Sequence, residues 1–129
     1  LQEEGGWTAI KAAASNGHSD LVMALISHHA SVDLADQIGW TPLMSASCNG
    51  HAQAAIGLLR NGASVDLQEK NGQTALMLAV RNGHSEIIMV LIDHNATVDR
   101  ADHQGWTPLM SASYHGHVIA TAVLLQNGA

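Results

Sequence analysis

The chain has 129 residues, a formal net charge of −6 and an apolar fraction of 47% that contains no Phe. Affinity for nucleic acid depends on clustered Lys and Arg, so five basic residues against eleven acidic ones argue against a phosphate-binding surface. One cysteine, Cys48, excludes a disulfide framework within the chain and favours a reducing, cytoplasmic setting. No apolar run approaches the length of a membrane span, so we expect no membrane contact.

A five-residue pattern, Gly-X-Thr followed by Ala or Pro and then Ile or Leu, recurs every 33 residues. It occupies residues 6–10, 39–43, 72–76 and 105–109. A Gly-His pair keeps the same step, with its glycine at positions 17, 50, 83 and 116. A fixed period of this length indicates a stacked array of similar units. We therefore divide the chain, as one domain over residues 1–129, into repeats of approximately 5–37, 38–70, 71–103 and 104–129.

Each unit is predicted to run helix, turn, helix, loop. In the second unit Thr41 is a helix N-cap and Pro42 suits the first helical position, where its missing N–H costs nothing. Asn49-Gly50 ends that helix after about two turns. The second helix of the unit begins near His51 and carries the apolar face of the core.

The second helices end at glycine in units two and four, at Asn61-Gly62 and Asn127-Gly128, because glycine readily takes the left-handed conformation. In units one and three His29 and Asn95 replace that glycine, and both residue types tolerate a positive φ better than most. The segment that follows in unit two, residues 64–72, is too polar for a buried strand. It is predicted to be an extended, hairpin-like loop.

The four units resemble the ankyrin repeat. The resemblance lies in the Gly-X-Thr-Pro-Leu opening, the Gly-His turn and the ending Leu-Leu-X-X-Gly-Ala-X-Val at residues 58–65, and it covers essentially all 129 residues. The sequence departs from the family at two places. The His that follows Thr-Pro-Leu is Lys11, Met44, Met77 and Met110 here, and the terminal Asn is Asp33, Asp66 and Asp99.

The resemblance implies an all-α solenoid of stacked helix-turn-helix units joined by β-hairpin-like loops. It further implies a non-catalytic module, without a cofactor, that binds another protein through the loop tips and the concave face of the first helices. Residues 1–4 align with residues 67–70 partway through a unit, so we expect a fragment of a larger ankyrin-repeat protein. We also expect a monomer.

The family's binding positions carry over to two sets of residues. On the loop tips these are Trp7, Ile38, Trp40, Asn71, Gln73, Gln104 and Trp106. On the first helices they are Ala12, Ser15, Ser45, Cys48, Leu78, Arg81, Ser111, Tyr114 and His115. Independently of the family, Trp, Tyr and Arg are the side chains most enriched at binding hot spots.

The tryptophans have two interpretations, which the sequence leaves open. Each indole either packs over the adjacent loop or contacts a partner, and both can hold together. Residues 39–51 and 105–117 are identical at 11 of 13 positions, so the deeper period is 66 residues. On this pattern we expect Trp40 and Trp106 to lie in matching settings.

The histidines do not indicate a metal site. Those of the Gly-His pairs lie one unit apart, whereas zinc needs nitrogens about 2.0 to 2.1 Å from one ion. We expect their rings to bond to neighbouring backbone near the helix–helix turn. Cys48 and His51 lie across a turn with no third group to orient them, so no catalytic residue is expected.

Three functions remain open at this point. An adaptor that recruits a protein is favoured over a regulatory or spacer segment of a larger signalling enzyme or ion channel. The third, an engineered binder on the same scaffold, is disfavoured because the core residues differ from unit to unit. The partner's identity is not encoded in any general pattern.

Overall fold

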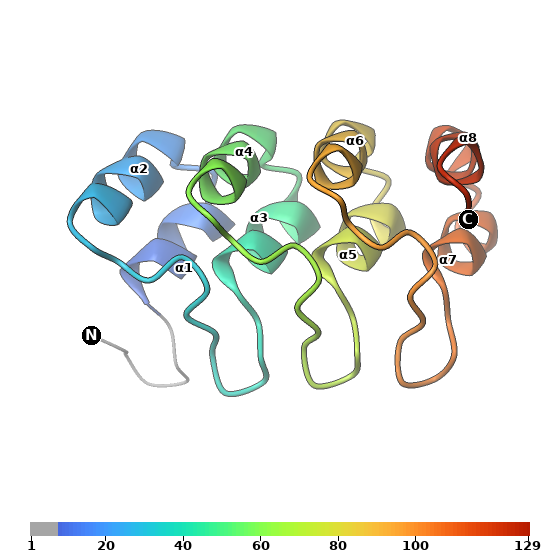
Figure 1. The fold of residues 1–129 in the computed structure, drawn as a ribbon, viewed down its shortest axis with the longest axis horizontal. Coiled ribbons are helices and arrows are strands. Elements are labelled where there is room, and N and C mark those ends of the chain that lie inside the picture. The colour runs from blue at the N-terminus through green and yellow to red at the C-terminus, as the bar shows by residue number, and fades with distance from the viewer. Residues whose placement is uncertain (1–7) are drawn as a thin grey trace.

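The computed structural model describes residues 8–129, which form eight helices in four antiparallel pairs (Figure 1). The pairs are α1 (Ala9–Ser15) with α2 (Ser19–Ser27), α3 (Pro42–Asn49) with α4 (Ala52–Arg60), α5 (Ala75–Arg81) with α6 (Ser85–Asp93), and α7 (Pro108–Tyr114) with α8 (Val118–Gln126). The first helices form one row, the second helices form another, and the loops project from the first row (Figure 1). The predicted all-α solenoid is confirmed.

The helix boundaries follow from the cap residues. The Thr41 hydroxyl accepts a hydrogen bond from the Met44 N–H at 3.2 Å, and Thr8, Thr74 and Thr107 cap their helices in the same way. His29 and Asn95 adopt φ values of 67° and 66°, so the predicted left-handed residues at these helix ends are confirmed.

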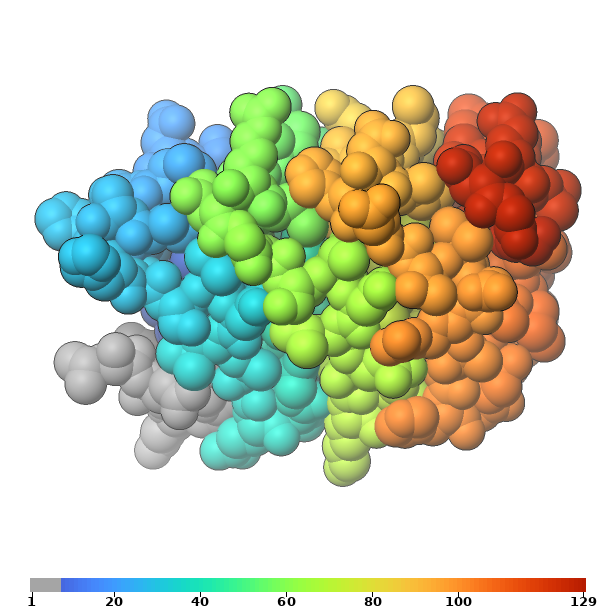
Figure 2. All heavy atoms as spheres, in the orientation of Figure 1, coloured from blue at the N-terminus to red at the C-terminus, as the bar shows by residue number. Residues whose placement is uncertain are grey.

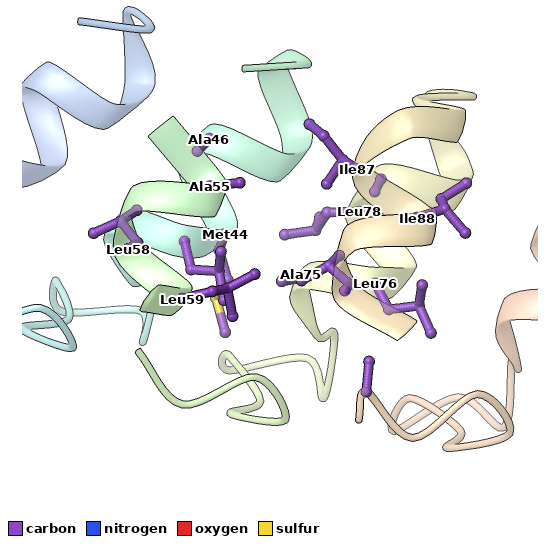
Figure 3. Packing of buried hydrophobic residues seen from close by; sticks show 14 of the residues in the cluster. Met44, Ala46, Ala55, Leu58, Leu59, Ala75, Leu76, Leu78, Ile87 and Ile88 are labelled. Atoms are coloured by element: carbon purple, nitrogen blue, oxygen red, sulfur yellow. The ribbon is translucent and has the colours of Figure 1, made fainter. Parts of the chain in front are cut away.

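The core lies between the two rows of helices and runs the length of the array. Figure 3 shows buried side chains of α3 and α4, among them Met44 and Leu59, beside those of α5 and α6, among them Leu78 and Ile87. Burial of each such side chain contributes roughly 1.5–3 kcal/mol. Each helix contacts its counterpart in the neighbouring unit, so the core is continuous from one unit to the next. Figure 2 shows the units stacked as successive slabs.

Bonds to an aspartate side chain repeat at two of the three junctions between units. The Asp33 carboxylate accepts from the Ser64 N–H at 3.0 Å and from its hydroxyl at 2.8 Å. The Asp66 carboxylate accepts from the Thr97 N–H at 2.9 Å and its hydroxyl at 2.7 Å. Aspartate at the position of the family's Asn therefore links the first unit to the second and the second unit to the third.

The Gly-His pairs make a second junction bond. His84 Nε2 lies 3.0 Å from the Cys48 carbonyl oxygen, and His117 Nε2 lies 3.0 Å from that of Arg81. A Cβ on Gly50 would lie 2.8 Å from Cε1 of His84, so the ring requires glycine beneath it. The predicted structural role of these histidines is confirmed at His84 and His117.

The hairpin-like loops are held by acidic side chains. Oδ1 of Asp36 accepts from the N–H groups of Ile38 and Trp40 at 3.0 and 2.9 Å, and Glu69 and Asp102 make the equivalent pairs of bonds. Neighbouring hairpins are joined by Lys70 N–H to the Ile38 carbonyl at 2.8 Å. The tips of the loops are therefore ordered relative to one another.

Lys11, where the family has histidine, forms an ion pair with Asp36. Both side chains are buried, and the pair joins α1 to the loop before α3. Burial raises the pKa of Asp36, but the hydrogen bond from Lys11 and those from the backbone N–H groups of Trp40 and Ile38 lower it by more. The pKa of Asp36 therefore lies below its ordinary value.

This ion pair predicts the acid response of the Lys11→Met variant, which has the residue found at that position in the other units. At pH 7 its free energy of unfolding should fall by about 1.5–3 kcal/mol, the range for a hydrogen bond to a charged group. In the wild type the contribution of Asp36 is complete above the ordinary carboxyl pKa and is lost as the pH falls through the lowered pKa of the folded state. The variant should therefore lose less stability on acidification.

Urea unfolding of the wild type and variant at about pH 7 and about pH 3 measures the difference. Lys70→Met, at an exposed loop position, is the control and should behave as the wild type. An equal acid-induced loss in Lys11→Met and wild type would contradict this account.

Candidate functional site

A hollow of about 350 Å³ lies on the loop and first-helix side of the array, between the third and fourth units. Its walls come from α5, α7 and the loops that precede them. We call it the Trp106 groove, and it is lined by Gln73, Met77, Arg81, Asp102, Gln104, Trp106, Thr107, Ser111, Tyr114 and His115. Its volume falls at the lower end of the range for ligand pockets, about 300–1,000 Å³.

One wall of the groove is aromatic. The rings of Trp106 and Tyr114 meet edge to face, with centroids 5.5 Å apart and an interplanar angle of 89°. The Tyr114 ring in turn meets that of His115 at 5.1 Å and 77°. Tyr114 is 75% exposed, so this wall presents ring surface to solvent.

Arg81, the last residue of α5, supplies a positive charge to the groove. Its guanidinium donates to the side-chain oxygen of Gln73 at 3.4 Å, and no carboxylate of residues 8–129 forms an ion pair with it. Asp102 also lines the groove, but its Oδ1 accepts from the N–H groups of Gln104 and Trp106, both at 2.9 Å. The guanidinium is therefore held in place by a neutral group.

His115 replaces the asparagine that ends the first helix in the other three units. The Asn16 and Asn82 side chains donate to the carbonyl four residues earlier, at 2.9 and 2.8 Å. Nδ1 of His115 lies 2.9 Å from the Ser111 carbonyl oxygen and keeps that bond. The substitution preserves the helix end while adding a ring to the groove.

Trp40 and Trp106 do not lie in matching settings, so that expectation was wrong. Trp40 is half-buried and packs against the core, whereas Trp106 is 36% exposed in the groove. A Cβ on Gly39 would lie 3.1 Å from Glu69 Cα, while one on Gly105 would meet nothing within 4 Å. The loop at Trp40 is thus covered by the following loop, and the loop at Trp106 is not.

The remaining predicted residues differ in how far they are exposed. Leu78 and Ser45 are 0% and 3% exposed, so their placement on an accessible face was wrong. Ser45 lies on α3, which packs between α1 and α5, and Leu78 lies on α5, which packs between α3 and α7. Ser111, the corresponding residue on α7, is half-buried and reaches the groove. Ile38 is exposed on its loop tip.

Four further predicted residues lie away from the groove. Ala12 and Ser15 are half-buried on α1, and Cys48 is half-buried, with its sulfur 3.5 Å from Nδ2 of Asn82. Asn71 is exposed, and its carbonyl accepts from the His103 N–H at 2.9 Å. Trp7 lies outside the described residues.

Sequence reasoning missed Met77, Asp102 and Thr107 as groove residues. In the sequence Met77 stands out only as a departure from the family pattern, and Thr107 only as the Thr of the recurring Gly-X-Thr. The acidic residue that recurs three positions before each Gly-X-Thr, at 3, 36, 69 and 102, was the available signal for Asp102.

Neither a metal centre nor a spanning helix is found within residues 8–129. No group of three or more His, Cys, Asp or Glu side chains in this range is placed to hold a metal ion. None of its helices is both long and apolar enough to cross a membrane.

Comparison with known families agrees with the fold. The family model described as ankyrin repeats (3 copies) matches residues 1–69 and 56–129, and the chain therefore belongs to the ankyrin-repeat family. A search of curated proteins finds no match. Members of this family are generally protein–protein interaction modules and are typically non-catalytic.

Because the two tryptophans lie in different settings, replacing each with Ala should lower the free energy of unfolding by a different amount. Trp40→Ala should lower the free energy of unfolding by about 2–4 kcal/mol, because a half-buried indole leaves the core. Trp106→Ala should lower it by less, by about 1 kcal/mol, because its indole is the more exposed of the two and lies outside the core. Chemical unfolding of both variants measures the difference, and equal losses would show that the two indoles pack alike.

Proposed function

We propose that this chain is an adaptor module that binds a protein partner through the Trp106 groove and the adjoining loop tips. The family supports protein binding in general, and the groove supplies a specific surface for it. Because the free thiol of Cys48 suits a reducing compartment, we propose that it acts in the cytoplasm.

The difference between the second and fourth units points to this surface. Residues 39–51 and 105–117 differ at two positions, where Cys48 and Asn49 correspond to Tyr114 and His115. Both of the fourth unit's residues line the groove. The other eleven positions of this segment are therefore the same in the two units, and the two that differ add Tyr114 and His115 to the aromatic wall.

The composition of the groove suits protein recognition. Trp, Tyr and Arg dominate binding hot spots because they bury a large area and also offer directed polar groups. Trp and Tyr do so at low entropic cost, since each has two rotatable side-chain angles. In the groove Trp106 and Tyr114 support each other, and Arg81 lies on the opposite wall of the junction.

The double variant Tyr114→Cys, His115→Asn tests this function, because it gives the fourth unit the residues of the second. The second unit shows that this pair is compatible with the fold, so unfolding stability should change by no more than about 0.5 kcal/mol. Loss of a hot spot worth about 2 kcal/mol should weaken partner binding roughly thirtyfold.

Quantitative affinity capture with the wild type and the double variant, under reducing conditions, measures the effect. Arg60→Gln, an exposed change outside the groove, serves as the matched control and should retain every partner. If the double variant also retains every partner at wild-type level, the groove is not the binding surface.

A further inference from the structure

We propose that the Trp106 groove selects a peptide segment in which Asp or Glu stands next to a large apolar residue. The carboxylate would bind Arg81 and the apolar side chain would lie against Trp106 and Tyr114. This inference rests on the proposed function and specifies the chemistry of the partner at that same surface.

The preference for a carboxylate follows from Arg81, the one Lys or Arg side chain of residues 8–129 that lines the groove. Lys11 is buried in its ion pair with Asp36, and Arg100 donates to the Asp66 carbonyl at 3.3 Å. Arg81 is exposed in the groove, and its guanidinium bonds only the neutral amide of Gln73 among the described residues. A planar guanidinium offers donors in a fork that matches a carboxylate, so an acidic side chain is its natural partner.

The groove contains little negative charge that would compete with an acidic ligand for Arg81. Asp102 is its one carboxylate, and this group is engaged by two N–H groups of its own loop. Gln73, Gln104, Thr107 and Ser111 are neutral and offer donors and acceptors to a peptide backbone. Charge complementarity therefore favours a negative group beside Arg81 and a neutral backbone along the rest of the groove.

The apolar preference follows from the aromatic wall and the size of the hollow. The T-shaped pair of Trp106 and Tyr114 leaves ring surface exposed, and covering such surface is favourable by roughly 25 cal/mol per Å². A volume of about 350 Å³ suits an anchoring side chain and its neighbour better than a whole helix. The ligand is therefore an extended segment with adjacent apolar and acidic residues.

Selection from a library of random twelve-residue peptides displayed on phage tests the inference. The baits are the immobilised wild type, Arg81→Gln, the matched control Arg60→Gln, and the double variant Tyr114→Cys, His115→Asn. The wild type and Arg60→Gln should enrich peptides with Asp or Glu beside a large apolar residue. Arg81→Gln should lose the acidic preference and keep the apolar one.

A titration then measures the contact itself, using the most enriched peptide and its Asp→Asn or Glu→Gln counterpart. Against the wild type, neutralising the peptide should raise the Kd about tenfold, as expected for a charge-assisted bond. Against Arg81→Gln the same change should alter the Kd less than about twofold, which isolates the pairwise coupling.

The outcomes separate this inference from the proposed function. Enriched peptides that lack acidic residues yet require Tyr114 and His115 would overturn the carboxylate preference and leave the binding surface standing. An unchanged acidic preference with Arg81→Gln would also overturn it. Absence of any enriched peptide that distinguishes wild type from the double variant would overturn both proposals.

Discussion

The junction between successive units is the constraint on which the structure depends. Two kinds of bond recur there. Ser64 and Thr97 donate to the Asp33 and Asp66 carboxylates of the preceding unit, and the rings of His84 and His117 bond the preceding unit's backbone. Each has a fixed partner one unit away, so the helices of neighbouring units have a defined offset. The apolar core supplies most of the stabilisation, while these bonds set the register of the stack.

The candidate site is a consequence of one such junction. Nε2 of His117 bonds the carbonyl of Arg81, so the residue that carries the charge is attached through its backbone to the fourth unit. Tyr114 and His115 immediately precede that same Gly-His turn. The backbone of Arg81 and the aromatic wall are therefore held in a defined relation by the contact that stacks the units. Preorganisation of this kind lowers the cost of binding, because little backbone ordering remains to be done.

Residues whose role is local were predictable from the sequence. The Thr caps, the glycine turns and the positive φ of His29 and Asn95 depend only on nearby backbone, and all were correct. Exposure was harder to predict, because it depends on what covers a position. Leu78 and Ser111 are equivalent in the repeat, yet one is buried and the other reaches the groove. Trp40 and Trp106 differ for the same reason, and periodicity alone does not contain that information.

The most direct test of the account follows the indole N–H signals of Trp40 and Trp106 in ¹H–¹⁵N spectra, assigned with single Trp variants, while a selected acidic peptide is added. The Trp106 signal should shift and saturate with the peptide, because its ring lines the groove. The Trp40 signal should stay in place, because its ring packs on the core beneath the next loop. A shift of Trp40 equal to that of Trp106, or an unmoved Trp106 signal, would contradict the claim that recognition is confined to the junction of the third and fourth units.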